Sequence, residues 1–189
     1  GSGKSTLLSM IIGDNPLGYG QDMVLFGKKK GSGETIWDIK KKIGYFTPAM
    51  TMFFSRSDKV EHMIISGLTD SVGLYTKPNG VQEKIAEAWL QLLGDAFRNK
   101  YFHQLTFGQQ RMLLVVRAMV KQPPLLILDE PTVGLDDNNA ALFLDLIQAI
   151  ISQRKVTVVY VSHRDEPRLQ PDKIFEFLPS AYGSVGRVL

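Results

Sequence analysis

The chain has 189 residues, of which 44% are hydrophobic and 22% charged, and its formal net charge is +3. This composition is typical of a globular domain with a sizeable apolar core. Because the chain has no cysteine, disulfide bonds, thiolate metal sites and a cysteine nucleophile are excluded. No apolar run approaches the roughly 20 residues that span a bilayer, so we expect the chain itself not to cross a membrane.

Two lysine triplets, Lys28–Lys30 and Lys40–Lys42, supply much of the positive charge. An anionic partner is one interpretation, but we favour an ordinary solvated surface because the net excess is mild. The chain opens at Gly1 and not at a methionine, so we expect it to be an N-terminally truncated fragment.

The first quarter of the chain alternates helical and extended patterns. The apolar run of residues 7–12 stops at Gly13, which is a typical helix end signal. In chain order, the pattern predicts a helix over 7–12, a strand over 23–26, a helix over 35–42 and a strand over 43–46.

The middle of the chain is mainly helical in pattern, with a break at Lys77-Pro78-Asn79-Gly80. We therefore predict a helical subdomain, about residues 50–122, inserted into a core built on a sheet. The pattern then predicts a helix over 109–121, a strand over 125–128, a helix over 138–152, a strand over 156–161, and edge strands over 175–177 and 185–189. Strands alternating with helices favour an α/β fold with a largely parallel sheet.

Gly3-Lys4-Ser5 matches the end of a phosphate-binding P-loop, G-x-x-x-x-G-K-[ST]. Glycine lets backbone N–H groups approach phosphate oxygens, and a helix that starts near Ser5 offers further amides to the anion. Lys4 would neutralise the β- and γ-phosphates, and the Ser5 hydroxyl would coordinate Mg²⁺. A glycine linker that leads into a helix is the alternative interpretation.

The apolar run Leu125–Leu128 is followed by Asp129-Glu130-Pro131, which predicts a buried strand with two acids at its carboxyl end. Ligands of open α/β sheets bind beyond that end. Pro131 favours an extended conformation at Glu130, and adjacent extended residues point to opposite sides. We therefore expect Asp129 to face a metal ion and Glu130 to face an attacking water, with an ordinary acidic turn as the alternative.

Two further positions fit an anion-binding site. Gly108, at the start of the helix predicted after residue 108, leaves free amides for an anion, and the Thr106 hydroxyl adds a donor. His163 comes just after the carboxyl end of the strand predicted over 156–161. Asp129 lies at the same end of the other buried strand. An ordinary helix entry and a structural histidine are the alternatives, and we assign no role to His62 or His103.

In order and spacing, these segments resemble the motifs of ABC-type ATPases: a P-loop, a signature segment, a Walker B strand and a switch histidine. The family signature is Leu-Ser-Gly-Gly-Gln, which Leu105-Thr106-Phe107-Gly108-Gln109 matches at three of five positions. Gly134-Leu135-Asp136 resembles the loop that crosses the family's dimer interface. The resemblance implies a P-loop NTPase fold and one ABC ATPase domain over residues 1–189.

A narrower resemblance rests on Gly31–Asp38, the bulky Phe107 and Gln109-Gln110-Arg111, which are similar to tandem molybdenum-transport/photorepair ATP-binding proteins. It implies one ATPase half that works with a second ABC domain in a head-to-tail nucleotide sandwich. The implied function is ATP binding and hydrolysis for a transport system, and the narrower resemblance extends this to a molybdate-related system. The implied location is the cytoplasm, at the inner-membrane face, with a membrane permease as partner. A soluble ABC ATPase that acts on nucleic acid or protein is the alternative.

The resemblance also implies a role for each matching residue. Glu130 would orient or deprotonate water, His163 would contact the γ-phosphate, and Asp129 would support the Mg²⁺ shell. The residues implied to bind ATP, with Ser5 also a Mg²⁺ ligand, are Gly1, Ser2, Gly3, Lys4, Ser5, Thr6, Thr106, Phe107, Gly108, Gln109 and Asp136. Thr47-Pro48 departs from the family, which usually has a glutamine there that senses the metal and contacts membrane partners.

The P-loop's first glycine, and the aromatic residue that stacks on adenine in these ATPases, would precede Gly1. We therefore predict that the 189-residue chain alone binds Mg-ATP weakly or not at all, since much of the nucleotide contact is missing. Equilibrium titration measures this directly, and a Kd in the low micromolar range would contradict the prediction.

Overall fold

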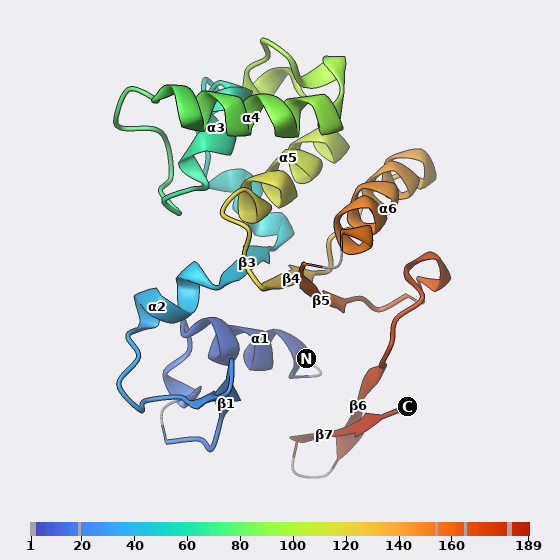
Figure 1. The fold of residues 1–189 in the computed structure, drawn as a ribbon. Helices are drawn as coiled ribbons and strands as arrows, with labels where there is room; N and C mark the ends of the chain where they lie inside the picture. The colour runs from blue at the N-terminus through green and yellow to red at the C-terminus, as the bar shows by residue number, and fades with distance from the viewer. Residues whose placement is uncertain (1–2, 19, 154, 165, 181–182) are drawn as a thin grey trace. The chain divides into compact units, whose positions relative to one another are not determined.

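The computed structural model describes residues 3–18, 20–153, 155–164, 166–180 and 183–189. The chain forms two compact units (Figure 1). One contains Gly1–Lys42 and Arg164–Leu189, and the other contains Ile43–His163. Among the described residues, no helix combines the length and the apolar character that a membrane span needs.

The first unit contains the predicted helix and strand, and a second short strand that was not predicted. Helix α1 (Lys4–Ile12) ends at Gly13, whose φ of 86° is left-handed and whose N–H donates to the carbonyls of Met10 and Ser9. The predicted glycine end signal is thereby confirmed. The following elements are η1 (Pro16–Gly18), the antiparallel pair β1 (Val24–Leu25) and β2 (Lys28–Lys29), and α2 (Ile36–Lys41).

Acidic side chains pair with lysines of both triplets within this unit. Lys29 lies 2.9 Å from Asp22, Lys40 lies 2.6 Å from Asp14, and Lys42 lies 3.2 Å from Glu34. This local pairing supports the interpretation of the triplets as solvated surface.

The chain's last two strands differ from the prediction. After η5 (Pro167–Leu169), β6 (Phe175–Ser180) and β7 (Gly183–Val188) pair antiparallel, with Phe175 opposite Val188. In the described part of the chain they form a two-stranded sheet of their own and are not edges of the parallel sheet. Two strands that follow each other closely pair most simply as a hairpin, and an ion pair between Glu176 and Arg187 links them.

The second unit is built on a parallel sheet. Its strands are β3 (Ile43–Phe46), β4 (Leu125–Asp129) and β5 (Thr157–Val161), in the order β3-β4-β5. In β4, Leu126, Ile127 and Leu128 are fully buried, as predicted for a strand covered on both faces. β5 was expected to be equally buried, but its residues are half-buried or exposed, because β4 is its one strand neighbour in this sheet.

Helices cover this sheet and extend away from it (Figure 1). Helix α5 (Phe107–Met119) is central, since it contacts β3, α3 (Val60–Ser66), α4 (Gly80–Leu93) and α6 (Asp137–Ser152). It begins two residues earlier than predicted. The short helices η2 (Pro48–Met52), η3 (Asp95–Phe97) and η4 (Phe102–Gln104) join these elements. The predicted helical subdomain, about 50–122, contains α3, α4 and α5, and its separate status stays a prediction.

Candidate functional site

The start of α1 has the features of a phosphate-binding helix end. Gly3 takes a φ of 82°, a left-handed conformation that glycine adopts without a Cβ penalty. Gly3 is the N-cap residue and has no side chain that could cap α1, and Ser5 and Thr6 are exposed. The first amides of this nine-residue helix lie at the positive end of its dipole, which favours an anion. The predicted site residues Gly1 and Ser2 lie outside the described residues.

The second group of predicted residues lies at the carboxyl end of the parallel sheet, in the second unit. Asp129 ends β4 opposite Val161, the last residue of β5, and is only 9% exposed. Glu130 follows it, and its backbone N–H donates to the Val161 carbonyl at 2.9 Å. Parallel pairing thus brings the ends of two strands, 32 residues apart, to one edge.

The prediction that Glu130 is extended is wrong. Its φ is 49°, in the left-handed region that few residues other than glycine adopt. The chain must leave β4 at once, because the Glu130 N–H is bound to β5 while the Glu130 carbonyl accepts a 3.3 Å bond from Val133. These two backbone bonds outweigh the extended preference that the following proline imposes.

Glu130 and His163 form a pair at this edge. His163 Nε2 lies 2.8 Å from Glu130 Oε1. The Glu130 side chain is 30% exposed and the His163 side chain 64% exposed. A carboxylate that is partly withdrawn from water and held by an imidazole has the chemistry of a general base.

The start of α5 is a capping box and not a row of free amides. Thr106 Oγ1 accepts the Gln109 N–H at 3.3 Å, and Gln109 Oε1 accepts the Thr106 N–H at 2.9 Å. Fewer backbone N–H groups are therefore free for an anion than expected, because the backbone N–H of Gln109 already bonds to Thr106. Phe107 remains 49% exposed beside this box.

The start of α6 lies against the start of α5. Asp136 caps α6 by accepting the Asn139 N–H at 2.9 Å and its Nδ2 at 2.6 Å. The backbone and then the side-chain bonds from Asn139 hold the pKa of Asp136 below its usual value. A Cβ on Gly108 would lie 2.5 Å from Asn139 Oδ1. Glycine at position 108 is thus needed for the two helix ends to lie close together.

Arg111, for which no role was predicted, lies against the turn after β4. It is only 3% exposed, and its Nη1 donates to the Pro131 carbonyl at 2.6 Å. Its guanidinium lies 4.3 Å from the centre of the Phe107 ring, and burial lowers its pKa. The i,i+4 spacing of Phe107 and Arg111 was the one available sequence signal.

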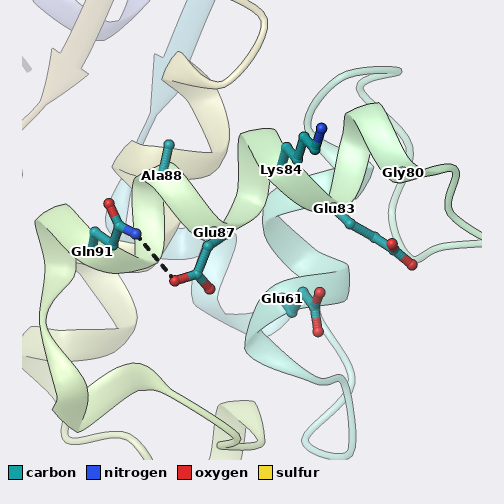
Figure 2. A pocket seen from close by; sticks show the side chains of 7 residues that line it. All are labelled: Glu61, Gly80, Glu83, Lys84, Glu87, Ala88 and Gln91. Atoms are coloured by element: carbon teal, nitrogen blue, oxygen red, sulfur yellow. Dashed lines mark hydrogen bonds between the residues drawn. The ribbon is translucent and has the colours of Figure 1, made fainter.

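A surface groove lies elsewhere in the second unit, along α4 (Figure 2). None of the predicted site residues lines it. Glu87 in this groove binds Arg98 at 2.7 Å and accepts from Gln91 at 3.3 Å, and these bonds lower its pKa. The groove is lined by Glu61, Gly80, Glu83, Lys84, Glu87, Ala88 and Gln91.

A model of one protein family, described as ABC transporter, matches residues 1–133. This chain belongs to the ABC transporter family. It is 47% identical to the ABC transporter ATP-binding protein ModF of Escherichia coli (strain K12), over 88% of the chain and 34% of ModF. It is 35% identical to the zinc uptake system ATP-binding protein ZurA of Listeria innocua, over 86% of the chain and 62% of ZurA. The chain thus spans about a third of ModF and less than two thirds of ZurA.

Two solved ABC structures share the fold. CbiO1 from Clostridium perfringens, part of the ABC transporter complex cbiONQ, has a TM-score of 0.74 at 24% identity, covering 92% of this chain and 68% of that chain. The ATP-binding cassette MJ0796, in a dimeric post-hydrolysis state bound to ADP and Pi, has a TM-score of 0.66 at 24% identity, covering 86% and 71%. The predicted α/β P-loop fold of the ABC type is thereby confirmed.

The close contact between α5 and α6 leads to a prediction about the stability of the folded protein. Gly108→Ala should lower the free energy of unfolding by about 1–3 kcal/mol, the usual cost of overpacking a tight contact. Asn139→Ala in the same chain should restore part of this loss, because it removes the Oδ1 and Cγ atoms that the new methyl group would meet.

Urea unfolding of both single variants and the double variant measures the coupling between the two positions. Gly80→Ala is the control, since a Cβ there would meet no atom within 4 Å. Equal destabilisation by Gly108→Ala with and without the Asn139 side chain would contradict the close packing.

Proposed function

We propose that the protein binds Mg-ATP and hydrolyses it as the ATPase component of an ABC-type transport system. The observation that carries the proposal is the Glu130–His163 pair at the carboxyl end of β4, at 2.8 Å. Ligands of α/β sheets bind beyond that end, and membership of the ABC transporter family supports ATP as the ligand.

ATP phosphates fit the start of α1. The left-handed Gly3, the start of a nine-residue helix and the exposed Ser5 and Thr6 suit an anion, and Lys4 supplies a positive charge. The P-loop pattern extends this assignment to Gly1 and Ser2.

The P-loop and Walker B patterns each supply an oxygen donor for Mg²⁺, Ser5 in the first and Asp129 in the second. No group of three or more His, Cys, Asp or Glu side chains gathers into a cage in the described ranges. Mg²⁺ bound with nucleotides needs no such cage, since it takes one or two protein oxygens, phosphate oxygens and water. When bound, it would neutralise negative charge on the phosphoryl oxygens.

Glu130 would act on the attacking water. Its carboxylate is partly buried and held by two fixed points, the backbone bond to Val161 and the side-chain contact with His163. Glu130 would orient the water or accept its proton, and His163, the more exposed partner, would turn to the γ-phosphate when ATP binds.

A second ABC domain would complete the site in a head-to-tail sandwich. In this proposal Thr106, Phe107, Gly108, Gln109 and Asp136 face ATP bound to the partner domain. Their placement side by side at the starts of α5 and α6 supports the proposal, as does the dimeric state of MJ0796.

Transport is proposed from the relatives, because an ATPase domain contacts ATP and not the cargo. The narrower sequence resemblance points to a molybdate-related system, while the zinc uptake system of ZurA is evidence that similar domains serve other cargo. The protein would work in the cytoplasm, docked on a membrane permease. A soluble ABC ATPase that acts on nucleic acid or protein is the alternative, and one feature favours it. Thr47, where the family usually has glutamine, follows β3 as the N-cap residue of η2 and offers no amide side chain.

The role of Glu130 makes a direct prediction for the full-length native polypeptide. Glu130→Gln should lower kcat for Mg-ATP by ~10²–10⁴-fold, since the amide cannot accept a proton. Binding of ATP should persist, because the start of α1 is unchanged. Steady-state phosphate release and equilibrium ATP titration measure the two effects.

Glu83→Gln is the control, since Glu83 lines the groove along α4, which none of the predicted site residues lines (Figure 2). It should leave turnover unchanged. Wild-type turnover in the Glu130→Gln variant would rule out the role proposed for Glu130.

A further inference from the structure

The backbone of Glu130 needs support from its surroundings. A left-handed φ of 49° is unfavourable for a glutamate, and such a residue persists where neighbouring contacts hold it on both sides. On the N-terminal side, the Glu130 N–H is bound to Val161. On the C-terminal side, the Val133 N–H donates to the Glu130 carbonyl at 3.3 Å, and α5 adds a second contact.

Arg111 supplies this second contact. Its Nη1 donates to the Pro131 carbonyl at 2.6 Å, and Pro131 is buried directly after Glu130. A charged donor makes a stronger hydrogen bond than a neutral one, and burial strengthens it further. The Nε of Arg111 is also buried and has no hydrogen-bond partner among the described residues. The guanidinium is therefore held by its bond to the Pro131 carbonyl and by the Phe107 ring.

Phe107 joins this contact to the protein surface. Its ring lies 4.3 Å from the guanidinium carbon, a cation–π distance, while about half of the residue is exposed. A single line of contacts therefore runs from an exposed ring at the start of α5 to the backbone beside Glu130.

We propose that Arg111 is a positioning residue that fixes Glu130 through the Pro131 carbonyl and couples its position to the start of α5 through Phe107. Arg111 itself is buried and does not reach the reacting atoms. The catalytic part of this inference rests on the proposed ATPase function, whereas the positioning part concerns the chain's own backbone.

Arg117 offers a matched control on the same helix. It is 6% exposed, its guanidinium lies 4.8 Å from the Phe54 ring, and its Nη2 donates to the Ser71 carbonyl at 2.7 Å. It thus makes the same two kinds of contact as Arg111, but with the segments on either side of α3 and not with the turn after β4. Its Nε also donates to Ser66 Oγ at 3.2 Å.

The test compares Arg111→Met, Arg111→Lys and Arg117→Met in the full-length native polypeptide. Amide hydrogen exchange over residues 129–135 reports the turn, and kcat and KM for Mg-ATP report the reaction. Urea unfolding of each variant separates these effects from a general loss of stability.

Arg111→Met should speed exchange over 129–135 by roughly tenfold or more, because the turn loses its anchor. It should lower kcat by roughly 10²-fold, as expected when a reacting group is misplaced by about 1 Å, with KM within a factor of about two. Arg111→Lys should recover part of both losses, because an ammonium can donate to Pro131 but lacks the planar guanidinium. Arg117→Met should lower stability without either effect.

Equal effects of Arg111→Met and Arg117→Met on exchange and kcat would overturn the proposal, since Arg111 would then act only on stability. Faster exchange without a loss of kcat would overturn it as well. A wild-type protein without ATP turnover would refute the proposed function instead, and the exchange comparison would still decide whether Arg111 positions the turn.

Discussion

The hydrogen bond from the Glu130 N–H to the Val161 carbonyl is the contact on which the rest of the candidate site depends. It extends the parallel pairing of β4 and β5 by one step beyond Asp129, so the chain turns away with Glu130 already fixed. The same pairing brings His163 to within 2.8 Å of Glu130. Without this bond, the acidic Glu130 and the basic His163, which come from distant segments, would not be held side by side.

The helices α5 and α6 support this edge through their first residues. Arg111 binds the carbonyl after Glu130, and Gly108 allows close contact with Asn139. Asn139 is in turn held by Asp136. Gly108 and Asp136 therefore have two roles. The sequence resemblance implies that they face nucleotide in a sandwich, and in this structure they also help to pack the two helix ends together. A change in the position of Phe107 at the start of α5 would therefore act on the backbone beside Glu130 through Arg111.

Local patterns predicted the elements that carry the candidate site, because each has a strong local signal. The apolar run Leu125–Leu128 gave β4, and Gly13 gave the end of α1. The conformation of Glu130 was mispredicted, because a tertiary bond to Val161 overrides the local effect of Pro131. The contact of Arg111 with Pro131 joins residues 20 positions apart and leaves no periodic signal. The Thr106–Gln109 capping box was readable from its spacing, but those residues were interpreted as anion donors.

The most direct test of the account is a crystal structure of the full-length protein with Mg-ADP and vanadate, which mimics the phosphoryl group in transfer. The account predicts a Glu130 carboxylate oxygen within ~2.6–3.2 Å of the vanadate oxygen opposite ADP, a hydrogen-bond distance suited to proton transfer. It also predicts that His163 contacts vanadate while the Glu130–Val161 backbone bond is retained. A structure in which Glu130 stays bound to His163 and turned away from vanadate would contradict it.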